Sequence, residues 1–282
     1  MKLPTYIRSF LSITTVSIGI AGLANTPVKA DNTLFFDGFD GPTLNPMWQA
    51  SLPNASLAPY GGIGATYLGA PDYTFQTLNG YSVLVMSNNM SDLQRVGWNS
   101  GTSFDPSAFT YEVRFNTLVQ SSTTSIDSFI ELWILDPTNP NRYDMVTLFG
   151  ASYSTYLEFA VGSTIDNTFN AQAFNYANDT WYRLVIQDLP GQNIRVSLND
   201  DSGAELIGQT LSHDEGAYSS GFEICLSQAM HFPLSTYPSD VAVDYVRLVA
   251  IPEPDSMVLI AGALCGLAAA RKWRLAQTKH SR

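Results

Sequence analysis

Cysteine and lysine are nearly absent from most of this chain. Cys265 lies near the C-terminus, which leaves Cys225 as the only thiol in residues 31–250. No disulfide can form within that segment, so a packed core has to stabilise it. The same segment has no lysine, and its six arginines face twenty-three aspartates and glutamates, a formal net charge of −17. Because phosphate binding needs a cationic surface, this balance predicts no nucleic-acid partner.

A helical period is also missing from residues 31–250. In the run 109–115 the residues Phe109, Tyr111, Val113 and Phe115 alternate with polar ones, the period of a half-buried strand. Turn residues separate many such runs, a pattern typical of a β-sandwich or β-barrel. The expected strands are 34–36, 81–86, 109–115, 129–135, 143–149, 157–161, 181–187, 194–198, 222–226 and 241–246.

The familiar catalytic motifs are missing as well. The chain has no G-x-S-x-G, no P-loop and no H-E-x-x-H. His213 and His231 stand eighteen residues apart without a cysteine pair, which is a poor zinc signature. Cys225 lies in an apolar strand pattern, which favours a buried thiol over a nucleophile. No organic cofactor is expected.

One pair of carboxylates invites comparison with glycosidases. Asp127 and Glu131 lie four residues apart on an expected strand, on one face but about 13 Å apart. Glycosidases place their two carboxyl groups about 5–5.5 Å or about 6.5–9.5 Å apart. We therefore interpret both as solvated acids on a sheet face, name no catalytic residue and predict that the chain is not an enzyme.

The N-terminal thirty residues have the order of a secretory signal peptide. Lys2 and Arg8 provide positive charge, an apolar run covers 10–23, and Val28 and Ala30 are small residues before a cleavage point. The alternative is a membrane anchor, although serine and threonine interrupt the apolar run. The prediction is export of the segment that begins at residue 31.

The tail, residues 251–282, has three ordered parts. Pro252, Glu253 and Pro254 form a hinge, residues 257–270 are uncharged, and a basic cluster follows at 271–274. This order resembles the PEP-CTERM sorting signal of Gram-negative surface proteins. The resemblance implies transient inner-membrane anchoring, processing by an exosortase, and delivery to the cell surface or extracellular matrix. The alternative is a permanent anchor, for which fourteen residues are short.

The central segment, residues 31–250, carries a second resemblance. The run 37–48 (DGFDGPTLNPMW), the run 178–199 around Trp181 and Tyr182, and the closing runs 221–224 and 243–248 look like parts of concanavalin A-like and laminin-G-like jelly rolls. The resemblance implies an all-β fold, a two-sheet antiparallel jelly-roll sandwich, in which carbohydrate partners are frequent. Fold alone does not fix function.

Tyrosine- and glycine-rich segments are the candidate ligand-binding surface. Flat aromatic rings with nearby hydroxyl and carboxyl groups suit the apolar faces and hydroxyls of sugars. The alternative is that these tyrosines cap the core or line turns. The candidate residues are Tyr60, Tyr67, Tyr73, Tyr153 and Tyr156.

Acidic residues near the ends of the segment suggest one metal. If the first and last strands are neighbours, Asp37, Asp40 and Asp244 could supply the oxygen ligands that calcium prefers. The alternative is that they form turns or face solvent.

Together these observations predict an exported jelly-roll protein, a non-catalytic carbohydrate-binding or exopolysaccharide-associated module. The open alternatives are a glycan-active enzyme with an atypical site and a purely structural surface protein.

Overall fold

The computed structural model divides into two units, Met1–Asp31 and Asn32–Arg282. It describes residues 32–52, 66–88, 94–105, 108–118, 126–139, 141–150, 157–163, 168–175, 177, 179–189, 193–212, 218, 221–232 and 239–251. The expected signal peptide and the sorting signal at Pro252, Glu253 and Pro254 lie outside these ranges. Within them, no helix has the length and apolar character needed to span a membrane.

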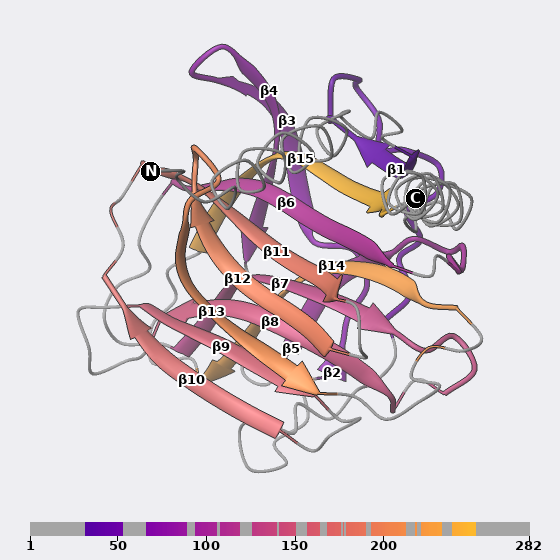
Figure 1. The fold of residues 1–282 in the computed structure, drawn as a ribbon. Helices are drawn as coiled ribbons and strands as arrows, with labels where there is room; N and C mark the ends of the chain where they lie inside the picture. Colours follow the sequence, from indigo (N-terminus) through magenta and orange to yellow (C-terminus); the bar gives the residue numbers. More distant parts are fainter. Residues whose placement is uncertain are drawn as a thin grey trace, which may run out of the picture. The chain divides into compact units, whose positions relative to one another are not determined.

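The described residues form strands that assemble into two sheets (Figure 1). The eight-stranded sheet has the order β13-β12-β11-β6-β15-β4-β3, with β1 also paired to β15, and the seven-stranded sheet has the order β10-β9-β8-β7-β14-β5-β2. The strands are β1 (Asn32–Asp37), β2 (Thr66–Tyr67), β3 (Asp72–Leu78), β4 (Tyr81–Asn88), β5 (Gln94–Asn99), β6 (Phe109–Thr117), β7 (Ile126–Leu135), β8 (Tyr143–Gly150), β9 (Leu157–Ser163), β10 (Thr168–Phe174), β11 (Trp181–Leu189), β12 (Asn193–Asp200), β13 (Glu205–Ser212), β14 (Glu223–Phe232) and β15 (Ser239–Ala250).

Strand pairing within the described residues is antiparallel except for the two-residue β2–β5 pair. The predicted all-β, two-sheet antiparallel jelly-roll sandwich is thereby confirmed. The hairpin expected around Trp181 and Tyr182 is the β11–β12 pair.

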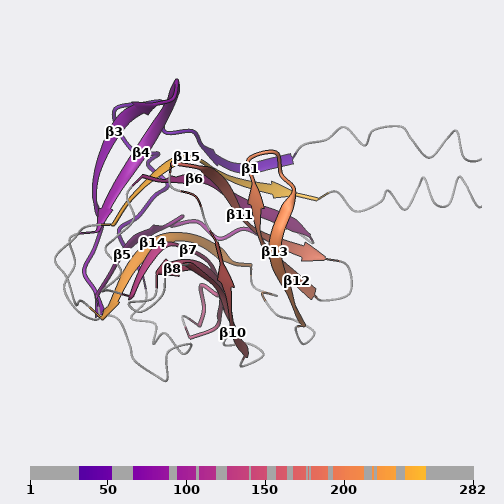
Figure 2. The same ribbon diagram turned by 90° about the vertical axis from the view of Figure 1, so that its left-hand side faces the viewer.

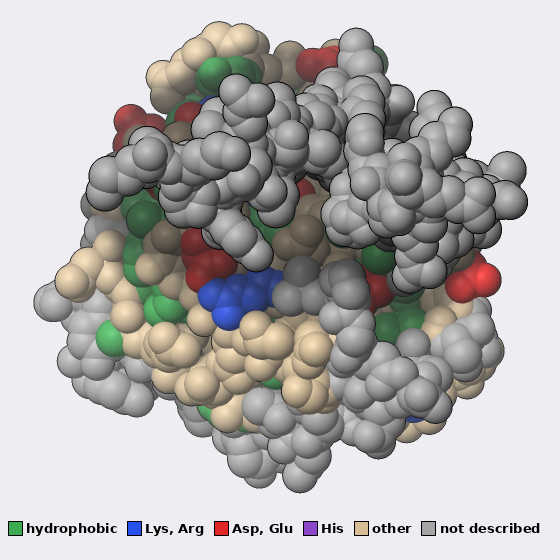
Figure 3. All heavy atoms as spheres, viewed as in Figure 1, with side chains coloured by type: hydrophobic (Ala, Val, Ile, Leu, Met, Phe, Trp, Pro, Cys, Tyr) green, Lys and Arg blue, Asp and Glu red, His purple; other side chains and the backbone are tan. Residues whose placement is uncertain are grey.

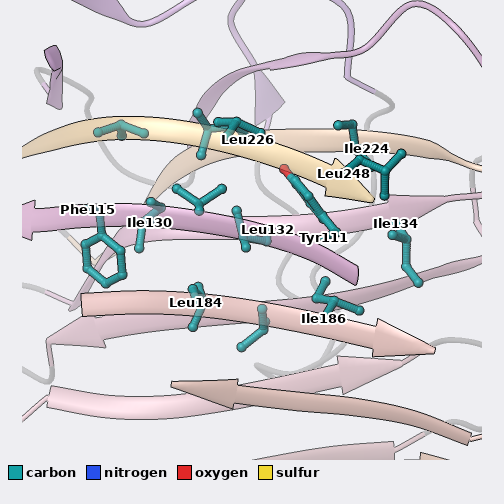
Figure 4. Close-up of a cluster of buried hydrophobic side chains, with 14 of the residues drawn as sticks. Tyr111, Phe115, Ile130, Leu132, Ile134, Leu184, Ile186, Ile224, Leu226 and Leu248 are labelled. Atoms are coloured by element: carbon teal, nitrogen blue, oxygen red, sulfur yellow. The ribbon is translucent and has the colours of Figure 1, made fainter. Parts of the chain in front are cut away.

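The core fills the space between the two sheets. On β6, Tyr111, Val113 and Phe115 face inward with 0% exposure. Side chains of β7, β11 and β14 meet them from both sheets (Figure 4). Full burial of such a side chain contributes about 1.5–3 kcal/mol, so this one layer supplies the stability that no disulfide provides.

The last strand holds the eight-stranded sheet together. One edge of β15 pairs with β6, and its other edge pairs first with β4 and then with β1. The first and last strands are therefore neighbours, with Asp37 opposite Val246.

The aspartate that ends β1 organises the following loop. Asp37 accepts hydrogen bonds from the Trp48 indole Nε1 (2.8 Å), the Phe39 backbone N–H (3.0 Å) and the Asn45 backbone N–H (3.4 Å). The Trp48 ring then packs edge-on against Phe35, with ring centroids 5.0 Å apart. A buried indole N–H needs an acceptor, and the carboxylate of Asp37 is that acceptor.

Asp37→Ala should lower the free energy of unfolding by about 2–4 kcal/mol, because it leaves the buried Trp48 N–H and two backbone donors without their acceptor. Denaturant titration followed by tryptophan fluorescence measures this loss. Asp40→Ala is the matched control, since Asp40 is exposed and should change stability by less than about 0.5 kcal/mol. Equal losses in the two variants would contradict this account of the loop.

Candidate functional site

Each strand of the seven-stranded sheet has one face in the core and one face turned away from the other sheet, here named the outer face. Ile130, Leu132 and Ile134 belong to the core cluster, whereas Trp133 and Leu135 belong to a separate buried cluster. Figure 2 shows β14, β7 and β8 curving beneath β15 and β6. The outer face is the side of these strands turned away from β15 and β6.

A buried polar group lies in the middle of this outer face, and we name it the Arg95–Glu131 cluster. The Arg95 Nε donates to Glu131 Oε2 at 2.9 Å, and the Ser227 hydroxyl donates to the same oxygen at 2.6 Å. The Trp133 indole N–H donates to Ser227 Oγ at 3.0 Å. The Arg95 guanidinium carbon lies 4.3 Å from the centre of the Trp133 ring. All four side chains are at most 2% exposed.

Strand register brings these residues together. Ser227 on β14 lies opposite Glu131 on β7 and, across its other edge, opposite Gly97 on β5. A Cβ atom at Gly97 would lie 2.5 Å from the Ser227 Cβ and 2.6 Å from the Leu226 carbonyl oxygen. Glycine at 97 therefore permits close approach of the two strands, and Arg95, two residues away on the same face, reaches across to Glu131.

The electrostatics of the cluster give Glu131 a definite form. Burial of a lone carboxylate is costly, but a guanidinium and a hydroxyl donor both favour the ionised form. A buried carboxylate held in this way is unsuited to donating a proton.

Apolar and aromatic side chains surround the cluster on the same face. Trp133 and Tyr143 have ring centroids 4.7 Å apart, and Leu52, Met145 and Cys225 complete the apolar surroundings. The expectation of a buried thiol at Cys225 is confirmed, and burial raises the pKa of that thiol. The arrangement surrounds a few fixed polar groups with buried apolar side chains.

Of the two predicted tyrosines that the structure describes, Tyr67 and Tyr73, Tyr67 lies at this place. Its ring packs against the Trp133 and Cys225 surroundings, and its hydroxyl donates to the Gly97 carbonyl oxygen at 3.0 Å. Burial raises the pKa of the Tyr67 phenol to about 12. Tyr67 thus acts as a hydrogen-bond donor at neutral pH.

A second carboxylate on the outer face has the opposite character. Glu223, at the start of β14, accepts a hydrogen bond from the Asn99 side chain at 3.1 Å, and burial raises the pKa of its carboxyl group. Glu223 lies four residues from Ser227, which is about 13 Å along the strand. Glu223 and Glu131 are therefore too far apart to act on one glycosidic bond directly.

The expectation for Asp127 and Glu131 needs correction. The pairing of β7 with β8 shifts register between Ser128 and Ile130, and the pairing with β14 shifts in the same region. This bulge interrupts the simple alternation that predicted a shared face for the two acids. The prediction that Glu131 is solvated is also wrong, because its side chain is fully buried in an ion pair.

Of the other predicted tyrosines the structure describes Tyr73, which does not join the cluster. Tyr73 lies on β3, in the other sheet, where it is 39% exposed and meets Phe75 and Trp98 edge-on. Tyr60, Tyr153 and Tyr156 lie outside the described residues. His213 does too, and His231 lies in β14.

Two of the three residues predicted to bind calcium, Asp37 and Asp244, have other partners. Asp37 accepts hydrogen bonds from its own loop, as described above, and Asp244 Oδ2 accepts a hydrogen bond of 2.6 Å from Nη1 of Arg114. Asp40 is exposed. In the described part of the chain, no three His, Cys, Asp or Glu side chains lie close enough to hold a metal ion. The strands are neighbours as expected, but the three carboxylates are not brought together.

Arg114 is the centre of a different network, on the outward side of the eight-stranded sheet. Besides Asp244, it binds Asp201 with two hydrogen bonds, of 2.6 and 2.9 Å. Its guanidinium carbon lies 4.4 Å from the centre of the Tyr81 ring and 4.3 Å from the centre of the Trp181 ring. These hydrogen bonds raise the pKa of Arg114 and lower the pKa of Asp201. On the face shown in Figure 3, basic and acidic side chains lie beside one another.

Comparison with known proteins identifies the fold and no closer relationship. No family model matches the sequence, and no curated protein matches it. Among solved structures, the CBM2 module of the evolved Dit protein of Lactobacillus casei BL23 phage J-1 matches with a TM-score of 0.55 and 10% identity, covering 79% of this chain and 98% of that one.

Two enzymes have the same fold. A mutant endo-β-1,3(4)-glucanase of glycoside hydrolase family 16, bound to a glucan oligosaccharide, matches with a TM-score of 0.53, 13% identity, and coverage of 78% and 95%. An endo-acting O-glycanase of the human gut microbiota matches with a TM-score of 0.52, 15% identity, and coverage of 78% and 100%. The class that these comparisons define is the two-sheet jelly-roll sandwich fold.

The prediction that the chain is not an enzyme is corrected by this comparison. Structures with this fold include glycoside hydrolases. The prediction also relied on the spacing of Asp127 and Glu131 along an unbroken strand, and the bulge in β7 removes that premise.

Glu131→Ala should lower the free energy of unfolding by about 3–5 kcal/mol, because Arg95 would keep a buried charge without its carboxylate. Arg95→Leu with Glu131→Leu should cost clearly less than the two single changes added together. Urea titration of Arg95→Leu, Glu131→Leu and the double variant gives the coupling energy. Additive losses would mean that the two charges do not interact.

Asp201→Asn should reduce the difference between the melting temperature at pH 7 and that at pH 3. A lowered carboxyl pKa contributes stability that is present above the ordinary value of about 3.9 and lost as pH falls through the folded value. The native chain should therefore exceed the variant in melting temperature at pH 7 and approach it near pH 3. Asp72→Asn, at an exposed position, is the control, and a similar convergence there would refute the assignment to Asp201.

Proposed function

We propose that this protein is glycan-active and that its glycan binds at the outer face of the seven-stranded sheet. The observation that carries the proposal is the Arg95–Glu131 cluster, a buried ion pair against the Trp133 ring on the face opposite the core. Charged groups are seldom buried for stability alone, because apolar side chains of similar volume stabilise equally well or better. A similar fold in glycan-binding and glycan-cleaving proteins supports the choice of ligand.

The chemistry of the face assigns different tasks to its residues. Glu131, ionised and fixed by Arg95 and Ser227, would stabilise the positive charge that develops on a sugar ring as a glycosidic bond breaks. Burial raises the pKa of Glu223, so this carboxyl group would keep its proton to a higher pH than an exposed glutamate, and it would bind a neighbouring hydroxyl group. Trp133 and Tyr143, both buried, form the aromatic wall beside Glu131.

We further propose export and sorting to the cell surface or matrix of a Gram-negative bacterium. The support is the order of parts in residues 1–30 and 251–282, including Pro252, Glu253 and Pro254. An exosortase would be the processing partner, and an exopolysaccharide the glycan met at that location.

Glycan activity can be tested with the full-length chain. Release of reducing ends from mixed-linkage β-glucan, mucin O-glycans and the exopolysaccharide of the source bacterium measures cleavage, and calorimetry measures binding. Glu131→Gln keeps the size of the side chain and removes its charge, so we expect at least a tenfold loss of cleavage or affinity.

Glu205→Gln is the matched control for that test. Glu205 forms an exposed ion pair with Arg195 in the other sheet, so its neutralisation should leave activity and binding unchanged. Thermal melts confirm that both variants fold. A folded Glu131→Gln variant with native activity, or a native chain that neither binds nor cleaves any of these glycans, would overturn the proposal.

Mass spectrometry of the surface form from the native host tests the sorting proposal. We expect a protein that begins at Asp31 and ends near Pro252, because signal peptidase and exosortase would each remove one terminus. Recovery of a surface form that still ends at Arg282 would exclude removal of the tail.

A further inference from the structure

β10 is the outermost strand of the seven-stranded sheet in the described part of the chain. β10 pairs with β9 over all seven of its residues, from Thr168 opposite Ser163 to Phe174 opposite Leu157. In the part of the chain that the structure describes, no strand pairs with its other edge (Figure 1). The backbone groups on such an edge can accept a further strand.

β10 lacks the features that protect other edges. Its sequence, TFNAQAF, has no charge, no proline and no glycine, and its pairing with β9 has no register shift. By contrast, β13 has a bulge beside Glu205, which forms an ion pair with Arg195. β3 begins with the exposed Asp72, and β2 has only two residues. Selection against edge pairing is visible elsewhere in this fold and missing at β10.

The residues of β10 also complement a second β10. Two identical edge strands can pair antiparallel about a two-fold axis perpendicular to the sheet. Paired residues must lie on the same face of the sheet, so the axis passes midway between the two copies of one residue. An axis at Ala171, the middle of the strand, pairs all seven residues. The bulky Phe169, 40% exposed, then lies opposite the small Ala173, and the amide of Asn170 opposite the amide of Gln172.

We propose that two copies of this chain associate through β10, antiparallel, with Ala171 of one copy opposite Ala171 of the other. The seven-stranded sheets then form one continuous sheet across the dimer. The interface is self-complementary, as a two-fold dimer requires, and its cross-strand pairs are large against small and amide against amide. This association is independent of the proposed glycan site.

Ala171→Cys tests the register directly, in the full chain with Cys265→Ser, so that the buried Cys225 is the only native thiol left. Facing Cβ atoms in an antiparallel pair lie about 4.5–5.5 Å apart, close to disulfide distance. Mild oxidation should therefore yield a covalent dimer on a non-reducing gel. Ala173→Cys is the matched control, because the two copies of that position would lie four residues apart, about 13 Å, and should not cross-link.

Charges introduced on β10 distinguish pairing through this strand from other modes of association. Asn170→Lys with Gln172→Lys places like charges opposite each other and should give a monomer in sedimentation velocity at concentrations where the native chain dimerises. Asn170→Lys with Gln172→Glu places opposite charges together and should restore the dimer. A monomeric native chain, or a dimer unaffected by the double lysine variant, would overturn the proposal.

Discussion

The apolar layer between the two sheets constrains everything else in this protein. Because strand side chains alternate, each residue committed to the core commits its neighbours to an outward face. Tyr111, Val113 and Phe115 in one sheet meet Ile130, Leu132 and Ile134 in the other, with no disulfide to assist. The outward faces are then free to hold charge, and each sheet holds its charge differently.

The two charged groups differ in what they can do. Arg114 contacts two aromatic rings and two carboxylates on the eight-stranded sheet, and its acids are partly exposed, so the network joins strands and turns. The Arg95–Glu131 pair is wholly buried and lies beside aromatic side chains. Its desolvation makes it a costly way to stabilise a sheet, which favours a role in ligand chemistry. This contrast places the proposed site on the seven-stranded sheet.

Alternation and turn residues in the sequence predicted the strands with clear apolar faces, such as β6, β11 and β15. They did not predict β5, whose buried Arg95 breaks the apolar pattern, nor the edge strand β10, which is polar and half exposed. The site was missed for a related reason. Glu131 pairs with an arginine thirty-six residues away, and neither that register nor the bulge in β7 has a local sequence signal. A buried arginine in a domain with few basic residues was the available hint.

The central claim is that a glycan binds to the outer face of the seven-stranded sheet around Glu131. Hydrogen–deuterium exchange of the full chain, with and without an oligosaccharide cleaved or bound by the native protein, tests it most directly. The account predicts slower exchange in peptides that cover β5, β7 and β14, with β6 and β11 unchanged. Protection confined to β6, β11 and β15 would place the ligand on the other sheet and contradict the account.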